Sequence, residues 1–205
     1  MSSSGELVLA LPEWLRPFAS DAAPAPALAD RMALVIDLAR RNVEQSSGGP
    51  FAAAVFELPS GRLVGVGVNR VVPSRTSIAH AEILALGLAQ QRLGQWDLGA
   101  PGLPPFELVA STEPCAMCLG AVVWSGVRRL VCGARDADAR GIGFDEGPKS
   151  GDWVEELAAR GVDVEQDVCR EAAVAVLRAY ADGGGLIYNA RQGAPPPRPE
   201  AGGGA

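Results

Sequence analysis

The sequence STEPCAMCLGAVVW at residues 111–124 places Cys115 and Cys118 three positions apart, directly after a proline. An apolar run follows the cysteines, and residues three apart lie on one face of a helix. The stretch therefore predicts a helix over residues 115–125 whose first turn presents both sulfurs. The partial positive charge of a helix N-terminus favours the thiolate, which is the form of cysteine that binds metal.

The only histidine of the chain, His80, stands upstream in SIAHAEILAL at residues 77–86, and Glu82 follows it by two positions. A lone histidine is more often a satisfied polar side chain than a ligand, and an acid in the first turn of a helix often serves only the helix dipole. With Cys115 and Cys118, however, the two residues complete the pattern H-x-E followed by P-C-x-x-C. This combination is the signature of zinc deaminases.

The spacing also predicts the chemistry of the site. If the two helix N-termini meet, His80, Cys115 and Cys118 converge as three protein ligands. Three ligands are typical of a catalytic zinc ion, because the fourth tetrahedral position is left for water. Zinc lowers the pKa of that water to about 7. Glu82 is then expected to carry a proton from water to a ring nitrogen of the substrate.

Composition limits the class of protein. A chain of 205 residues with 48% apolar side chains is long enough for one domain and short for two. The N-terminus lacks the features of a signal peptide and no apolar run reaches the ~20 residues of a membrane helix, so we expect a soluble, cytoplasmic protein without a membrane partner. A net charge of -6 favours a small substrate and argues against nucleic acid. Cys132 and Cys169 are expected to be small buried hydrophobes.

The pattern along the chain predicts three regions. Residues 1–29 form an N-terminal arm that is partly rich in proline and alanine, residues 30–190 form the organised domain, and residues 191–205 form a disordered tail rich in proline and glycine. Within the domain, a helix capped by Asp30 precedes a hairpin made of FAAAVFEL and RLVGVGVNRV. Strands and helices then alternate to the end, which predicts an α/β domain with helices on both faces of a central sheet.

The organised domain resembles the cytidine deaminase superfamily and, within it, the bacterial guanine deaminases. The segments that carry the resemblance are GGPFAAAVFE, GVNRVV, AHAEILAL, STEPCAMCLGAVVWSGV and GIGFDEGP. The resemblance implies a three-layer α/β/α sandwich around a mixed five-stranded sheet. It also implies hydrolytic deamination of guanine to xanthine and ammonia, with aminotriazines such as ammeline as a possible side activity.

The same resemblance assigns roles to individual residues. Zinc would be held by His80, Cys115 and Cys118, with Glu82 as the proton shuttle. Glu146 matches a second acid that handles the leaving amino group, at a position where the family pattern often has aspartate. Four further residues fall at positions that contact the base: Phe51, Asn69, Trp124 and Tyr188. Tyr188 would reach the site of a partner subunit, because related guanine deaminases form homodimers that exchange their C-terminal segments.

Other functions share the same metal site. A tRNA adenosine deaminase has the same H-A-E and P-C-x-M-C patterns, although the acidic balance of this chain argues against it. Deamination of guanosine, cytidine or cytosine would use the same zinc and Glu82, since specificity lies in loops and pocket shape. A non-catalytic zinc-binding protein is the alternative from a different class, and a missing Glu82 or a fourth protein ligand would have favoured it.

Overall fold

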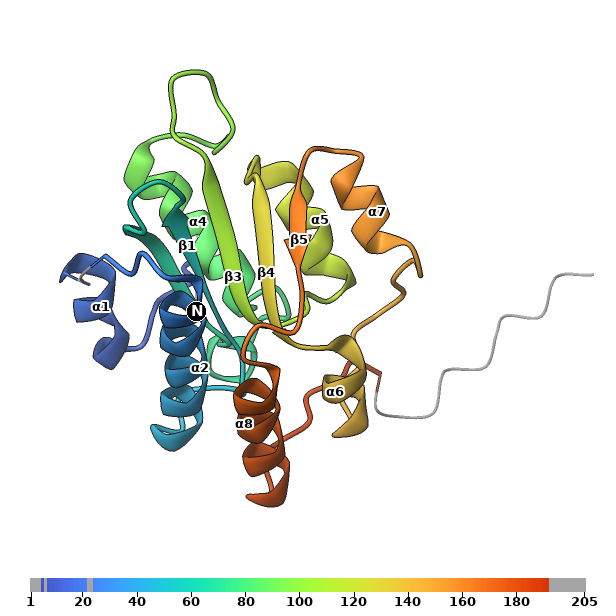
Figure 1. Cartoon of the computed structure of the whole chain (residues 1–205). Coiled ribbons are helices and arrows are strands. Elements are labelled where there is room, and N and C mark those ends of the chain that lie inside the picture. The colour runs from blue at the N-terminus through green and yellow to red at the C-terminus, as the bar shows by residue number, and fades with distance from the viewer. Residues whose placement is uncertain (1–4, 6, 22–23, 192–205) are drawn as a thin grey trace, which may run out of the picture.

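The computed structural model of the chain describes residues 5, 7–21 and 24–191 (Figure 1). Its centre is a five-stranded sheet in the order β2-β1-β3-β4-β5. The strands are β1 (Ala52–Glu57), β2 (Leu63–Val68), β3 (Phe106–Thr112), β4 (Arg129–Ala134) and β5 (Asp163–Glu165). β1 pairs antiparallel with both β2 and β3, whereas β3, β4 and β5 run parallel. The sheet is therefore mixed, as the resemblance implied.

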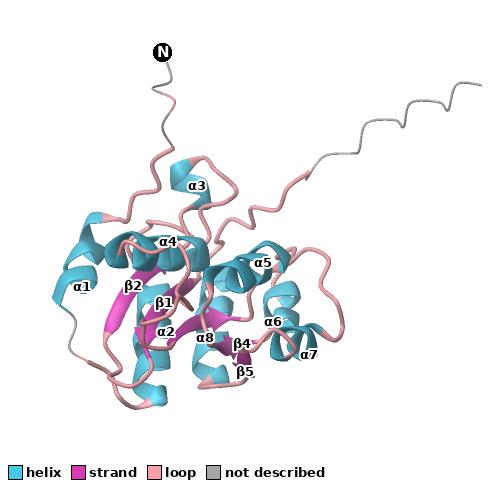
Figure 2. Ribbon diagram, turned by 90° about the horizontal axis from the view of Figure 1, so that it is seen from above, coloured by secondary structure: helices cyan, strands magenta, loops and turns pink. Residues whose placement is uncertain are grey.

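Helices cover both faces of this sheet (Figure 2). α2 (Leu28–Glu44) and α8 (Arg170–Asp182) pack on one face, and α4 (Ala81–Leu93) and α5 (Ala116–Ser125) pack on the other. Side chains of β1 alternate between the two cores: Ala54 and Phe56 join the first, and Ala53 and Val55 join the second. The predicted three-layer α/β/α arrangement is confirmed.

Several short elements complete the fold. They are the 3-10 turn η1 (Glu13–Leu15) and the helices α1 (Arg16–Asp21), α3 (Val71–Ser74), α6 (Asp136–Gly141) and α7 (Trp153–Ala158). α2 begins three residues earlier than predicted, and its N-cap is Ala27 instead of Asp30. Asp30 lies in the first turn, where a carboxylate still interacts favourably with the helix dipole.

The N-terminal arm packs on the domain. Leu15 is fully buried in the core beneath α2, and the indole Nε1 of Trp14 donates a hydrogen bond to Ser47 Oγ at 3.0 Å. The guanidinium of Arg31 donates to the carbonyls of Ala25 and Pro26. Most of the predicted C-terminal tail lies outside the described residues.

Two glycines set the position of α4 against β2. A Cβ at Gly67 would lie 2.1 Å from the carbonyl oxygen of Ala81, and one at Gly65 would lie 2.3 Å from that of Ala85. Only glycine permits a helix backbone to approach a strand this closely. Since Ala81 is the first residue of α4, Gly67 directly determines where the N-terminus of that helix sits.

The structure also bears on membrane-spanning helices and on the burial of Cys132 and Cys169. Among the residues it describes, none of the helices has the length and apolar composition needed to cross a membrane. Cys132 is fully buried in β4, as expected, but the expectation for Cys169 is wrong. Cys169 is exposed, because it is the N-cap of α8 and adopts a left-handed backbone conformation with φ of 52° outside the core.

Candidate metal centre and catalytic cavity

One edge of the sheet gathers the residues named from the sequence. Phe51 immediately precedes β1, Asn69 immediately follows β2, and Thr112 ends β3. Because β1 runs antiparallel to its two neighbours, its beginning lies beside their ends, and Ala52 pairs with Val68. The parallel strand β4 ends at the same edge, where Ala134 pairs with Thr112.

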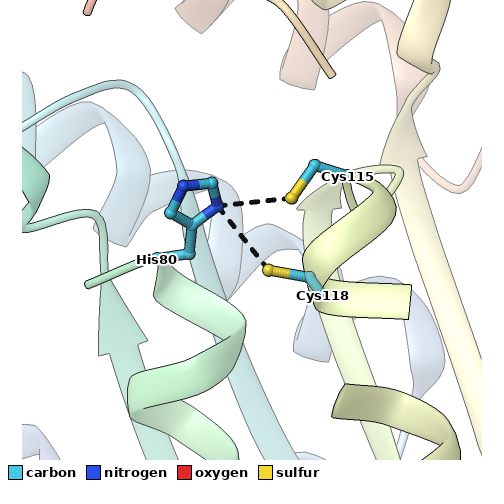
Figure 3. A group of neighbouring side chains, drawn as sticks. All are labelled: His80, Cys115 and Cys118. Atoms are coloured by element: carbon cyan, nitrogen blue, oxygen red, sulfur yellow. Dashed lines mark hydrogen bonds between the residues drawn. The ribbon is translucent and has the colours of Figure 1, made fainter. Parts of the chain in front are cut away.

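At this edge the N-termini of α4 and α5 face each other and bring three side chains together (Figure 3). His80 is the N-cap of α4 and Cys115 is the N-cap of α5. His80 Nδ1 lies 3.5 Å from Cys115 Sγ and 3.6 Å from Cys118 Sγ. The three potential ligand atoms lie within 4.8 Å of one another, so this group could hold a metal ion.

The ionisation of the cluster suits metal binding. Hydrogen bonds from Cys118 and His80 hold the pKa of the Cys115 thiol well below its usual value, which favours the thiolate. The hydrogen bond to Cys115, together with burial, raises the pKa of Cys118 in turn. The pair thus holds one negative charge before any metal is bound, and a cation would stabilise the second thiolate as well.

A cavity of about 290 Å³ opens beside the cluster. This volume is at the small end of the range for ligand pockets and suits one small ring system. Its walls come from the sheet edge, the two helix N-termini, the segment between α6 and α7, and the segment that follows α8. The residues that line it include Phe51, Asn69, His80, Glu82, Cys115, Phe144, Glu146 and Tyr188.

Three buried acids line this cavity: Glu113 accepts hydrogen bonds from the Gln166 side chain and the Asp136 backbone N–H, and the other two are Glu82 and Glu146. Glu82 lies in the first turn of α4, and burial raises its pKa above the usual value. Glu146 lies in the segment between α6 and α7, where its side chain is 7% exposed. Burial and the negative charges of Cys115 and Glu82 raise the pKa of Glu146 to about 8. Glu82 comes from α4 and Glu146 from the segment between α6 and α7, so these two acidic groups lie on different walls of the cavity.

Aromatic rings form the apolar wall of the cavity. Phe144 stands in the middle, with its ring centroid 5.0 Å from that of Phe51 and 5.0 Å from that of Tyr188, in edge-to-face geometry. Sequence reasoning selected Phe51 and Tyr188 but missed Phe144. The signal was present, since Phe144 lies two positions before Glu146 in the quoted segment GIGFDEGP.

The backbone of Asn69 is held by Asn42, another residue that the sequence did not point to. The side-chain Nδ2 of Asn42, which is fully buried in α2, donates to the carbonyl oxygens of Asn69 at 2.9 Å and Gly49 at 2.8 Å. The Oδ1 atom of Asn69 accepts the backbone N–H of Val71. This arrangement leaves Nδ2 of Asn69 as the side-chain donor available to a ligand in the cavity.

The structure places Trp124, which was expected to contact the base, away from this cavity. Trp124 lies near the end of α5, and its side chain is 81% exposed and does not line the cavity. The apolar run of α5 could not reveal this, because both sides of the helix carry apolar residues. Tyr188, expected in the site of a partner subunit, lines the cavity of its own chain. Exchange of the C-terminal segment between subunits stays a prediction.

Comparison with known proteins agrees with this geometry. The model of the family described as the cytidine and deoxycytidylate deaminase zinc-binding region matches residues 27–134, which include His80, Glu82, Cys115 and Cys118. The chain belongs to this deaminase family. The matched region holds every residue of the cluster but ends before Glu146, so the second acid lies outside the part that defines the family.

Two solved structures and one further relative are similar to this deaminase. A guanine deaminase from Nitrosomonas europaea is 50% identical with a TM-score of 0.86, and the match covers 89% of this chain and all of that structure. The structure of NE0047 in complex with 2,6-diaminopurine is 52% identical with a TM-score of 0.87, covering 92% of this chain and all of that one. The guanine deaminase of Bacillus subtilis is 35% identical over 54% of this chain and 67% of its own length.

Proposed function

We propose that this deaminase hydrolyses guanine to xanthine and ammonia. The observation that carries the proposal is the second buried acid, Glu146, in the same small cavity as Glu82 and the His–Cys–Cys cluster. Deamination of guanine needs a proton at the ring nitrogen and another at the leaving amine, and these two positions can be served by two separate carboxyl groups. The names of the relatives support the same substrate.

Zinc is the metal that we propose for the cluster, with His80, Cys115 and Cys118 as its ligands. A tetrahedral ion with bonds of about 2.05 Å to nitrogen and 2.3 Å to sulfur separates those two atoms by about 3.6 Å. The distances from His80 Nδ1 to the two sulfurs are 3.5 Å and 3.6 Å, so the residues fit. Zinc, when bound there, makes hydroxide available from water near neutral pH.

Glu82 is proposed to carry the first proton. It lies beside the cluster without belonging to it, and its buried carboxylate is a stronger base than an exposed one because burial raises its pKa. The carboxylate accepts a proton from the attacking water and donates it to the ring nitrogen next to the amino-bearing carbon. A transfer of this kind typically accelerates a reaction 10²- to 10⁴-fold.

Glu146 is proposed to serve the leaving group. Burial in the cavity raises the pKa of its carboxyl group, which favours the protonated form that can donate to the leaving amine. Donation to the exocyclic nitrogen lets the C–N bond break with ammonia as the leaving group, and the remaining proton of the added hydroxyl returns to the Glu146 carboxylate as the new carbonyl forms. The ring itself would lie among Phe51, Phe144 and Tyr188, whose faces and edges suit a flat heterocycle. Asn69 Nδ2 would donate a hydrogen bond to an acceptor on the base.

The test is ammonia release by the purified protein from a panel of amino-heterocycles, with the zinc content measured in parallel. The panel contains guanine, guanosine, cytosine, cytidine, adenine and ammeline, together with a tRNA transcript. We expect turnover of guanine, with slower turnover of ammeline and none of the tRNA. Turnover confined to a pyrimidine, a nucleoside or tRNA would contradict the proposal for Glu146 and Asn69, and zinc-loaded protein without any turnover would favour a binding role.

We also propose that the protein is a homodimer in the cytoplasm. Support for the dimer comes from the outer face of α5, where Met117, Val123 and Trp124 expose apolar side chains. An exposed apolar patch of this kind marks an interaction surface. Analytical ultracentrifugation should give twice the mass of the chain, and Trp124→Glu should give the mass of one chain.

A further inference from the structure

Lys149 occupies an unusual position for a cation. The chain has 18 lysine and arginine residues, and Lys149 is the only lysine among them. Its side chain is 7% exposed. Burying an ammonium costs several kcal/mol unless it is paired and hydrogen-bonded. A single lysine held inside the protein therefore needs acceptors around it.

Three acceptors converge on this ammonium. Lys149 Nζ lies 2.9 Å from Asp136 Oδ1, donates to the carbonyl oxygen of Pro114 at 3.2 Å, and lies 3.7 Å from Glu113 Oε2. The Asp136 backbone N–H in turn donates to Glu113 Oε2 at 2.9 Å, which fixes the two carboxylates relative to each other. A compact ammonium with three donors suits such a site better than a planar guanidinium.

These contacts tie the segment that carries Glu146 to the start of α5. Pro114 directly precedes Cys115, so the ammonium holds Lys149 against the entry to the metal-binding helix. The carbonyl oxygen of Glu146 accepts the backbone N–H of Ala116, the first residue of α5, at 3.0 Å. The segment is therefore attached to α5 at two points, through the backbone of Glu146 and, three residues later, through the side chain of Lys149.

A second connection runs through the same aspartate. Arg140 Nε donates to Asp136 Oδ2 at 2.5 Å, and another of its nitrogens donates to the carbonyl oxygen of Gly147 at 2.7 Å. Asp136 thus holds two cations that both contact the segment around Glu146. Neither Lys149 nor Arg140 lines the catalytic cavity. Both can affect the reaction only through the residues that do.

We propose that Lys149 is a positioning residue for Glu146, which holds the second carboxyl group at a fixed place relative to the cysteine ligands of α5. This proposal rests on the function proposed above, because positioning has a kinetic consequence only if Glu146 takes part in the reaction. A misplacement of about 1 Å at a reacting group costs up to about 100-fold in rate. The contacts of Lys149 therefore affect the rate of the chemical step more than binding of the base.

The first test is Lys149→Met, which keeps an unbranched apolar side chain against Trp153 and removes the ammonium. We expect kcat for guanine to fall at least tenfold, while KM changes less than threefold and one zinc per chain is retained. Amide hydrogen exchange gives a readout that needs no turnover. The backbone amides of residues 143–149 and of Ala116 should exchange faster in the variant than in the wild type.

A double-mutant cycle separates positioning from general stability. If Lys149 acts through Glu146, Lys149→Met should lower kcat no further once Glu146→Gln is present. The matched control is Arg31→Met, which removes another buried cation, the partner of Glu107 at 2.5 Å, near the opposite end of β3. This control should lower the melting temperature and leave kcat unchanged.

The proposal is overturned if Lys149→Met keeps its kcat, if its effect is equally large in the Glu146→Gln background, or if exchange of residues 143–149 is unchanged. If Lys149→Met does not fold, Asp136→Asn removes the carboxylate that Lys149 and Arg140 both contact. This variant must then show the same loss of kcat and the same faster amide exchange. A wild-type protein that does not deaminate guanine refutes the proposed function instead, and the exchange measurement still decides whether Lys149 holds the segment.

Discussion

The most specific structural prediction concerns Gly67, which lies on β2 beneath the first turn of α4. Substitution by alanine places a methyl carbon 2.1 Å from the carbonyl oxygen of Ala81. Ordinary van der Waals contact begins near 3.4 Å, so the strand and the helix must separate by roughly 1.3 Å. This contact is with helix backbone, which cannot rotate away as a side chain could.

The displacement falls on the residues of the site. Ala81 stands between His80 and Glu82, so a shift of α4 moves one proposed zinc ligand and the proton carrier together. Overpacking of this kind costs about 1–3 kcal/mol of stability. A shift near 1 Å is expected to cost about 100-fold in kcat. Zinc per chain should also fall below one, since the nitrogen moves away from the two sulfurs.

The assay compares Gly67→Ala with Gly87→Ala by zinc content, guanine turnover and denaturant unfolding. Gly87 lies in the same helix, and a Cβ there meets nothing within 4 Å. Replacement of a helix glycine by alanine stabilises by about 0.5–1 kcal/mol, so the control should be more stable and fully active. If Gly67→Ala keeps one zinc per chain and the turnover of the wild type, the close approach of α4 and β2 does not set the site.

Three other perturbations follow from the site. Cys118→Ala should lose both zinc and turnover, because two protein ligands remain, and metal analysis of the purified variant measures this. Phe144→Leu removes two edge-to-face contacts worth about 0.5–1.5 kcal/mol each, so denaturant unfolding should show a loss of roughly 1–3 kcal/mol and KM for guanine should rise. In metal-free protein, the raised pKa of Glu146 disfavours the charged form in the folded state, so stability is full below about pH 4.5 and is lost as the pH rises through about 8. The slope is at most about 1.4 kcal/mol per pH unit, and Glu146→Gln should flatten the stability profile in that window; an unchanged profile would contradict the burial of this carboxyl group.

Local patterns were sufficient for most of the fold. The apolar run FAAAVFEL before the turn PSG and the apolar spacing after His80 predicted β1 and α4, because each pattern reflects contacts of one element with the core. The short helices α3 and α6 were missed, since four to six residues carry too little periodicity. The cap of α2 was placed at Asp30 because aspartate is a common N-cap, whereas packing of Leu28 extends the helix by three residues.

The site was predictable where chemistry is tied to short spacing and unpredictable where it depends on distant packing. His80, Glu82, Cys115 and Cys118 lie in two short motifs, so their convergence could be expected. Support from Asn42 and Lys149 comes from segments far along the chain and has no local signal. The exposure of Trp124 depends on which face of α5 meets the sheet, and an almost uniformly apolar helix does not specify that face.

One buried carboxylate beside the metal cluster, that of Glu82, is proposed to move the proton during deamination of guanine. The most direct test of this role is guanine turnover by Glu82→Gln and by the wild type at equal zinc occupancy. Glutamine keeps the size of the side chain and cannot accept the proton, so we predict one zinc per chain in both proteins and a loss of about 10²- to 10⁴-fold in kcat for the variant. A Glu82→Gln protein that deaminates guanine at the rate of the wild type would show that Glu82 does not carry the proton.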